Sequence, residues 1–351
     1  MRDVDVETRP DNGDYTALRP LMFSIAYRMV GSVSEAEDIV QDAYLRLQRS
    51  GQLPAPERPR PPRPVAAEGP SSRARGTDRP PEPVRSREAY AATVTTRLAL
   101  DHLRSARVRR EAYVGPWLPE PLLTDVDADP AHRIERDESL SMAVLVLLER
   151  LSPVERAVFV LREVFEYEYD DVAEIVGKTP DNCRQIMGRA RRHIDEQRPR
   201  FEASQERREG LLRRFMAAMS EGDMAGLERL LAQDVAFYGD GGGKAPAIRA
   251  PIHGGTRVAR FLLGLARQAV EVRVRLEPVE VNGQPGVRAL DRDGRVVSVM
   301  ALDVVGGKIV ALRNVINPDK LRHLGPVGDL TVLLRERGGQ ATVERRAPGG
   351  S

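Results

Sequence analysis

The sequence predicts a multidomain protein in which two all-α units precede a C-terminal α+β domain. Three observations support this prediction. The N-terminal part repeats apolar residues at helical spacing, the middle contains a capped helix-turn-helix pattern, and the last third alternates apolar residues between tight turns. With 351 residues, the chain is long enough for two or three compact domains.

The first unit begins with two amphipathic helices. Residues 15–30 place apolar side chains on one helical face: Leu18, Leu21, Met22, Ile25 and Met29. Gly31 ends this helix, and Ser34 with Glu37 predicts a capping box at the start of the next one. Four polar residues lie on the outward face of the second helix: Glu37, Asp38, Gln41 and Asp42.

Residues 51–86 differ sharply in composition, with ten prolines and almost no large apolar residue. Such a segment cannot bury enough surface to offset its ordering entropy, so we predict a disordered insertion. Helical spacing returns near Glu88 and leads into the basic string RSARVRRE. The first unit is therefore expected at 15–113, after a disordered N-terminus at 1–14.

A linker and a second helical unit follow. The linker, expected at 114–138, contains the proline-punctuated segment GPWLPEPL and then an acidic stretch. Within 139–201, Ser152 and Glu155 predict a capping box with proline at the first helical position. A short helix closed by Gly177 and a further helix opened by Thr179 are typical of a helix-turn-helix.

The C-terminal domain is expected at 205–330, with a flexible tail at 331–351. A charged helix at 205–220 precedes four segments of alternating apolar residues: 272–281, 287–290, 296–305 and 309–315. NG, DRDG and GG turns separate these segments, which predicts an antiparallel sheet.

Composition limits the possible functions. The longest apolar stretch, residues 142–148, is far below the roughly 20 residues of a membrane span, and the polar N-terminus does not resemble a secretory signal. We therefore expect no membrane contact and a cytoplasmic protein. The single cysteine, Cys183, has no partner for an internal disulfide or a metal cluster, so we predict a packing role, no metal and no cofactor.

Two basic regions are compatible with nucleic-acid binding although the net charge is only +2. A charge run alone is more often a solvated face, so the helix-turn-helix pattern is the stronger indication. Residues 85–113 carry seven Arg against three acidic residues, and residues 184–200 carry six against two. The second helix of a helix-turn-helix enters the major groove, where Arg can read guanine, and Asn or Gln can read adenine. On this helix we predict seven DNA-contacting residues: Thr179, Asp181, Asn182, Arg184, Gln185, Arg189 and Arg192.

Three segments occur in an order that narrows the family: SVSEAEDIVQDAYLRL (32–47), LALDHLRSARVRRE (98–111) and LSPVERAVFVLREVFEYEYDDVAEIVGKTPDNCRQIMGRARRHI (151–194). They resemble regions 2 and 4 of sigma-70-family factors of the extracytoplasmic-function (ECF) group. The resemblance implies core RNA polymerase and promoter DNA as partners. It also implies that Asp38, Gln41 and Asp42 contact the clamp coiled coil of the largest polymerase subunit.

The resemblance further assigns the two DNA elements. The helix at 89–110 would read and melt the −10 element, with phosphates held by Arg97, Arg104, Arg107, Arg109 and Arg110. The helix-turn-helix would read the −35 element. The insertion at 51–86 departs from the family pattern and puts the loop length and melting geometry in question.

The C-terminal part carries three short motifs: WLPEP (117–121), DGGGK (240–244) and NPDKL (317–321). They resemble the SigJ-like subgroup, in which a cone-shaped α+β SnoaL-like domain of the nuclear-transport-factor-2 superfamily is fused to the sigma regions. The resemblance implies an interdomain latch that regulates the factor in cis. Its residues would be Trp117, Leu118, Pro119, Asp240, Gly241, Lys244, Asn317, Asp319 and Lys320.

Two other functions stay open from the sequence. SnoaL-like folds include enzymes that use a buried carboxylate as general base, and Asp240 at the base of a ligand-sized pocket would favour an enzyme or ligand sensor attached to a DNA-localising half. A plain DNA-binding repressor would not bind core polymerase. We favour a promoter-specificity subunit without enzymatic activity.

Overall fold

A computed structural model of the chain describes residues 13–49, 87–111, 113–124, 140–195 and 204–335, without the side chains of 13–16, 106–111 and 195. The predicted insertion at 51–86, the acidic part of the linker and most of the predicted disordered N-terminus and flexible tail lie outside the described residues.

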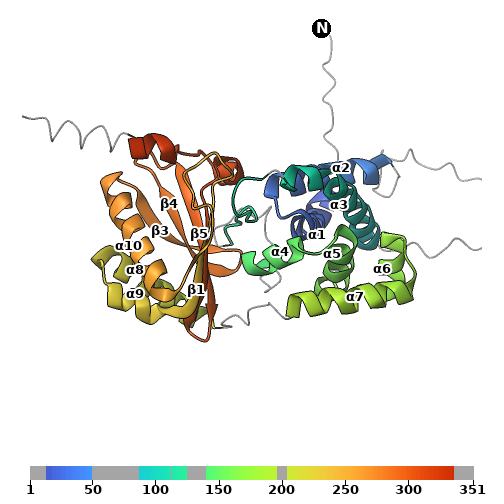
Figure 1. Cartoon of the computed structure of the whole chain (residues 1–351). Coiled ribbons are helices and arrows are strands. Elements are labelled where there is room, and N and C mark those ends of the chain that lie inside the picture. Colours follow the sequence, from blue (N-terminus) through green and yellow to red (C-terminus); the bar gives the residue numbers. More distant parts are fainter. Residues whose placement is uncertain (1–12, 50–86, 112, 125–139, 196–203, 336–351) are drawn as a thin grey trace, which may run out of the picture.

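The first helical unit contains α1 (Gly13–Val30), α2 (Val33–Arg49) and α3 (Arg87–Glu111). The three helices pack against each other (Figure 1). The apolar face predicted for α1 lies in the core, where Met22, Ile25 and Met29 are fully buried.

The capping box predicted at Ser34 and Glu37 is wrong. Helix α2 begins one residue before Ser34, and Ser32 Oγ accepts the hydrogen bond from Glu35 N (3.2 Å). Glu37 instead pairs with Arg19 of α1 (2.6 Å). Ser32 therefore starts the helix, and Glu37 ties α2 to its neighbour.

The second helical unit contains α4 (Met142–Glu149), α5 (Pro153–Phe159) continued by a π-helical turn (Val160–Val164), α6 (Tyr169–Val176) and α7 (Pro180–Asp195). The capping box of α5 is confirmed, because Glu155 N donates to Ser152 Oγ and Ser152 N donates to the Glu155 carboxylate (3.0 Å). Gly177 ends α6 with φ +67, and Cys183 is fully buried, as predicted.

The two helical units share one hydrophobic core. Helix α3 packs against α5 and α6, and buried apolar residues of both units form a single cluster. A buried guanidinium adds a polar tie: Arg156 of α5 donates to the carbonyl oxygen of Met29 and pairs with Glu149 (3.0 Å).

The C-terminal domain is α+β, with helices α8 (Gln205–Glu221), α9 (Met224–Leu230) and α10 (Gly255–Glu271) and a 3-10 helix, η4 (Pro318–Leu324). Its six strands are β1 (Leu231–Asp240), β2 (Ile252–His253), β3 (Arg275–Val281), β4 (Gln284–Leu290), β5 (Val296–Val305) and β6 (Lys308–Val315). They form one sheet in the order β2-β1-β6-β5-β4-β3, in which only the β1–β6 pair is parallel.

Two predicted boundaries in this domain differ from the structure. The strand expected from residue 272 begins at Arg275, because Val274 N still donates to Ala269 O of α10 (2.8 Å). The predicted flexible tail begins inside a helical segment, residues 330–335. Strand β1 was missed altogether.

Strand alternation gives the sheet two different faces. On one face, Met300 and Leu312 pack in a cluster with α8, α9 and α10. On the other face, Val299 and Val315 pack with Leu118 of the linker. The sheet therefore lies between its own helices and the helical half of the molecule (Figure 1).

Candidate functional site

The described part of the linker, residues 114–124, lies between the sheet and the first helical unit. Trp117 rests on the turn between α1 and α2, where a Cβ on Gly31 would lie 2.8 Å from the indole ring. Gly31 also has φ +68, and Glu120 N donates to its carbonyl oxygen (2.9 Å). A glycine at this turn is therefore required both for the backbone conformation and for the seat of Trp117.

Asp240 ends β1 and is fully buried under the linker. Its carboxylate accepts hydrogen bonds from Leu118 N (2.8 Å) and from the Tyr113 hydroxyl (2.5 Å). Burial and the hydrogen bond to Asp240 raise the pKa of Tyr113, so the phenol stays protonated and donates. These donors replace the water that a buried carboxylate loses.

Lys320 of η4 completes the charge balance at this point. Its Nζ lies 2.8 Å from Asp240, and both side chains are less than a tenth exposed. The same Nζ donates to Leu118 O (2.5 Å) and lies 4.3 Å from the centre of the Trp117 ring, a cation–π contact. One buried ion pair therefore holds the linker by its backbone and by its tryptophan.

The glycines that follow Asp240 allow the DGGGK loop to approach closely. A Cβ on Gly241 would overlap a backbone oxygen of the same loop, and a Cβ on Gly242, at φ +56, would overlap the amide group of Asn317. That amide donates to the Tyr113 hydroxyl (2.9 Å). The loop therefore presses against the phenol that holds Asp240.

Asn282 in the turn between β3 and β4 joins three parts of the molecule. Its Nδ2 donates to the Tyr27 hydroxyl of α1 (2.8 Å) and to Leu140 O before α4 (3.0 Å). Its Oδ1 accepts from Leu122 N of the linker (2.9 Å). Burial raises the pKa of Tyr27, which stays protonated and donates to Glu120 O (2.6 Å).

Glu120 of the linker caps helix α2. Its carboxylate accepts from Val33 N (2.7 Å), Ser34 N (3.2 Å) and Ser32 Oγ (2.8 Å). A carboxylate at a helix N-terminus satisfies free N–H groups and complements the helix dipole. The linker therefore contacts the start of the helix that carries the predicted polymerase-docking face.

The end of the linker lies along the outer strand of the sheet. Leu123 pairs with Val281 of β3 in antiparallel fashion, and Thr124 N donates to Glu280 O (3.0 Å). The linker thus extends the sheet edge by a short segment, which uses backbone groups that an edge strand leaves unpaired.

The structure brings most of the predicted latch residues together. Six of them meet in one cluster: Trp117, Leu118, Asp240, Gly241, Asn317 and Lys320. Pro119 is buried beside them, and Lys244 pairs with Asp319 at the exposed rim. Five residues of this region were missed: Tyr27, Tyr113, Glu120, Asn282 and His323. The ring of His323 contacts the linker, with Nε2 2.8 Å from Pro121 O. Glu120 stands inside the quoted WLPEP motif and Asn282 in a predicted NG turn, so both had a visible signal.

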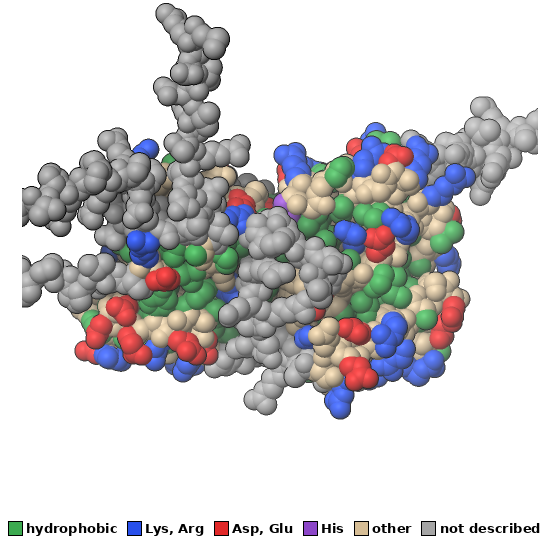
Figure 2. Space-filling view, turned by 180° about the vertical axis from the view of Figure 1, so that it is seen from behind, with side chains coloured by type: hydrophobic (Ala, Val, Ile, Leu, Met, Phe, Trp, Pro, Cys, Tyr) green, Lys and Arg blue, Asp and Glu red, His purple; other side chains and the backbone are tan. Residues whose placement is uncertain are grey.

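The predicted polymerase-docking residues Asp38, Gln41 and Asp42 are all exposed on α2. The seven predicted DNA-contacting residues, six on α7 and one just before it, are also exposed: Thr179, Asp181, Asn182, Arg184, Gln185, Arg189 and Arg192. Basic and acidic side chains lie side by side along the edge of the helical half that α6 and α7 form (Figure 2).

Two contacts order the start of α7. Thr179 Oγ1 accepts from Asn182 N (3.3 Å), as an N-cap does. Arg184 pairs with Asp181 (2.5 Å), and its guanidinium lies 5.2 Å from the centre of the Tyr169 ring.

The arginines predicted for the −10 element have different surroundings. Arg97 is exposed but donates to the carbonyl oxygens of Glu174 (2.9 Å) and Ile175 (3.3 Å) in α6. Arg104 is exposed and pairs with Asp101 (3.0 Å). Three of the predicted side chains lie outside the described residues: Arg107, Arg109 and Arg110.

A cavity of about 430 Å³ lies in the C-terminal domain, but Asp240 does not line it. The carboxylate faces the linker from the opposite side of the sheet, where its donors occupy it. None of the described residues that line the cavity is Asp, Glu, His, Cys, Lys, Arg or Tyr. Asp240 is therefore not placed to act as a general base in this cavity, and the described lining residues offer no other acid or base.

The described residues also bear on other classes of function. They contain no group of three or more His, Cys, Asp and Glu side chains placed to hold a metal ion. None of the helices in the described ranges combines the length and the apolarity that a bilayer crossing requires.

Comparison with protein families matches three parts of the chain. Residues 15–64 match sigma-70 region 2, residues 141–194 match sigma-70 region 4, and residues 212–312 match the SnoaL-like domain. The matches follow the order that the sequence motifs predicted.

Individual relatives are similar over nearly the whole chain. The chain is 35% identical to the ECF RNA polymerase sigma factor SigJ of Mycobacterium tuberculosis, over 88% of this chain and 92% of the relative. It is 31% identical to the probable ECF RNA polymerase sigma factor SigI of the same organism, over 90% of this chain and 96% of the relative. The crystal structure of SigJ superposes with a TM-score of 0.66 at 32% identity, covering 89% of this chain and 98% of that chain.

Proposed function

Because the chain belongs to the ECF RNA polymerase sigma factors, we propose that its C-terminal domain holds the sigma regions in a closed arrangement and thereby controls transcription initiation in cis. Sigma factors of this family bind core RNA polymerase and promoter DNA. The docking helix is α2, whose exposed Asp38, Gln41 and Asp42 contact the clamp coiled coil of the largest subunit. Helix α7 reads the −35 element, and the end of α3 holds the −10 element.

The distance between the two promoter elements supports the proposal that the described arrangement is a closed one. Elements centred at −35 and −10 are about 25 base pairs apart, or roughly 85 Å along B-DNA. Here the units that carry α3 and α7 share one core, and Arg97 of α3 is hydrogen-bonded to the backbone of α6. Helix α3 itself, with 25 residues, is only about 37 Å long. The two units therefore have to separate before both elements can be contacted.

The contact that carries the proposal is the capture of the linker by the C-terminal domain. The linker joins the two sigma regions, so their separation requires it to move. Asp240 and Lys320 hold its start, and Asn282 holds its later part together with α1 and the start of the second unit. Each of these contacts opposes opening.

Reconstituted transcription with core polymerase tests the proposal on the full chain. Asp240→Asn removes the charge that holds Lys320 and the linker, and we expect several-fold more transcript at equal factor concentration from a promoter identified with the reconstituted holoenzyme. Asp293→Asn is the matched control, because Asp293 is an exposed carboxylate in a turn of the same domain. Unchanged or reduced transcription by a folded Asp240→Asn variant would contradict inhibition by the latch.

A further inference from the structure

The cavity of the C-terminal domain lies on the face of the sheet opposite the linker. Strands β1 and β3–β6 form its floor, α8 and α10 form its walls, and Leu330 and Leu334 of the segment after η4 complete it. Its volume of about 430 Å³ falls in the range of small-molecule sites. The cavity is partly open at the surface, so a small molecule can enter it from solvent.

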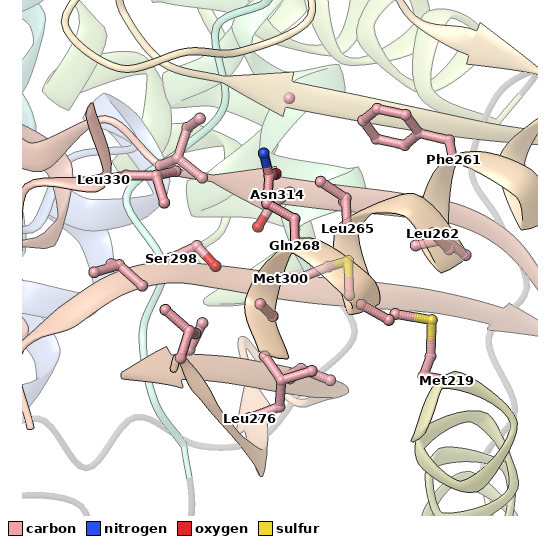
Figure 3. Close-up of a pocket in the computed structure, with 18 of the residues that line it drawn as sticks. Met219, Phe261, Leu262, Leu265, Gln268, Leu276, Ser298, Met300, Asn314 and Leu330 are labelled. Atoms are coloured by element: carbon pink, nitrogen blue, oxygen red, sulfur yellow. The ribbon is translucent and has the colours of Figure 1, made fainter. Parts of the chain in front are cut away.

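The described walls are apolar except for two amide side chains and one hydroxyl group. Figure 3 shows Ser298 and Asn314 among apolar side chains such as Leu265, Leu276 and Met300. Gln268 of α10 is the third polar residue that lines the cavity. Because no ionisable side chain lies among the described lining residues, a charged ligand would find no counter-ion here.

Asn314 carries a buried acceptor without a partner. It stands on β6 directly opposite Met300 of β5, so its side chain shares the cavity face of the sheet. Its Oδ1 is buried and makes no hydrogen bond. A buried carbonyl oxygen is costly to leave unpaired, and a donor supplied by a ligand would satisfy it.

We propose that this cavity binds a neutral, largely apolar small molecule that donates a hydrogen bond to Asn314 Oδ1. The apolar walls account for the body of the ligand, and the unpaired oxygen accounts for its donor. The absence of ionisable side chains among the described lining residues accounts for its neutrality. The described lining residues supply no acid or base, so the proposal is limited to binding. This binding is a property additional to promoter recognition.

A fluorescent probe of matching chemistry tests the site on the full chain. N-Phenyl-1-naphthylamine is neutral, apolar and carries one N–H donor, and we expect its emission to rise with saturable one-to-one binding. Its relative 8-anilinonaphthalene-1-sulfonate adds an anionic sulfonate to the same skeleton, and we expect it to bind at least about tenfold more weakly. Non-saturable binding, or equal affinity for the anionic probe, would overturn the proposal.

Two neighbouring positions on α10 provide matched variants. Ala269 lines the cavity, whereas Val270 is 77% exposed on the outside of the same helix. Ala269→Phe should fill the cavity and weaken the neutral probe by at least about tenfold, and Val270→Phe should leave its affinity unchanged. Equal effects of the two substitutions would place the probe elsewhere.

The hydrogen bond is tested separately at Asn314. The N-methyl derivative of the probe lacks the donor, and we expect the native chain to bind it about fivefold more weakly than the N–H form. Asn314→Leu removes the acceptor, so this preference should disappear while the apolar body is still bound. A preference that survives in Asn314→Leu would overturn the assigned role. The comparison of the two probes on the native chain and Asn314→Leu also tests the site if Ala269→Phe does not fold.

Discussion

The two faces of the C-terminal sheet are built from the same strands but carry different chemistry. The face toward the linker holds the buried Asp240–Lys320 pair, whereas the cavity face has no ionisable side chain among its described lining residues. Adjacent residues serve opposite faces, because Gly239 lines the cavity and Asp240 holds the linker. Strand alternation thus places a contact between domains on one face and the cavity on the other, at positions one residue apart.

The largest stability effect is expected on the linker face. Asp240→Asn should lower the free energy of unfolding by about 3 kcal/mol, because it leaves Lys320 Nζ buried without its carboxylate. Urea unfolding of the full chain, followed by the emission of Trp117, measures this change. Trp117 is the only tryptophan in the chain and lies against Lys320, so its emission reports on this contact.

A second substitution separates the charge from the packing. In the double variant Asp240→Asn with Lys320→Met, no charge remains buried, and the chain should be more stable than with Asp240→Asn alone. A double variant less stable than the single one would show that the unpaired ammonium is not the source of the loss.

Asn282→Gly should have a smaller effect of about 2 kcal/mol, because it removes three neutral hydrogen bonds and keeps the backbone conformation. Asn282 has φ +52, which glycine adopts freely. Faster hydrogen–deuterium exchange of residues 114–124 should report the loosened linker. Arg273→Gly is the matched control, since Arg273 has φ +56 but lies at the end of α10. Equal acceleration in both variants would assign the effect to backbone freedom.

Local patterns in the sequence predicted much of the fold. The Ser152–Glu155 capping box, the turn at Gly177 and the buried Cys183 follow from neighbouring residues, and the structure confirms them. The cap at Ser34 was wrong because Glu120, which is 86 residues away, bonds the N–H group of Ser34. Long-range partners of this kind leave no trace in local spacing.

The candidate site shows the same limit. Motif resemblance placed Leu118, Asp240 and Lys320 in one predicted latch. It did not predict the Tyr113 phenol, because nothing in the sequence links that residue to a carboxylate 127 positions later. The shared core of the two helical units was missed as well, since each unit alone has a complete helical pattern. The cavity could not be predicted, because a void depends on how side chains from several elements fail to meet.

The smallest effect is expected between the two faces, and it tests whether they act together. Ile316 lines the cavity, and its backbone N–H donates to Asp240 O (2.8 Å), so a ligand contacts the strand end that carries the linker clamp. The cavity is already formed in the latched arrangement, so a ligand that binds this form stabilises it. By reciprocity, opening the latch lowers the affinity for the ligand.

We expect Asp240→Asn to weaken the binding of N-phenyl-1-naphthylamine about two- to fivefold, at the low end of coupling between sites. Asp293 lies in an exposed turn and does not line the cavity, so Asp293→Asn should leave the affinity unchanged. Equal affinities for the native chain and Asp240→Asn would show that the two faces work independently although they share strands β3–β6.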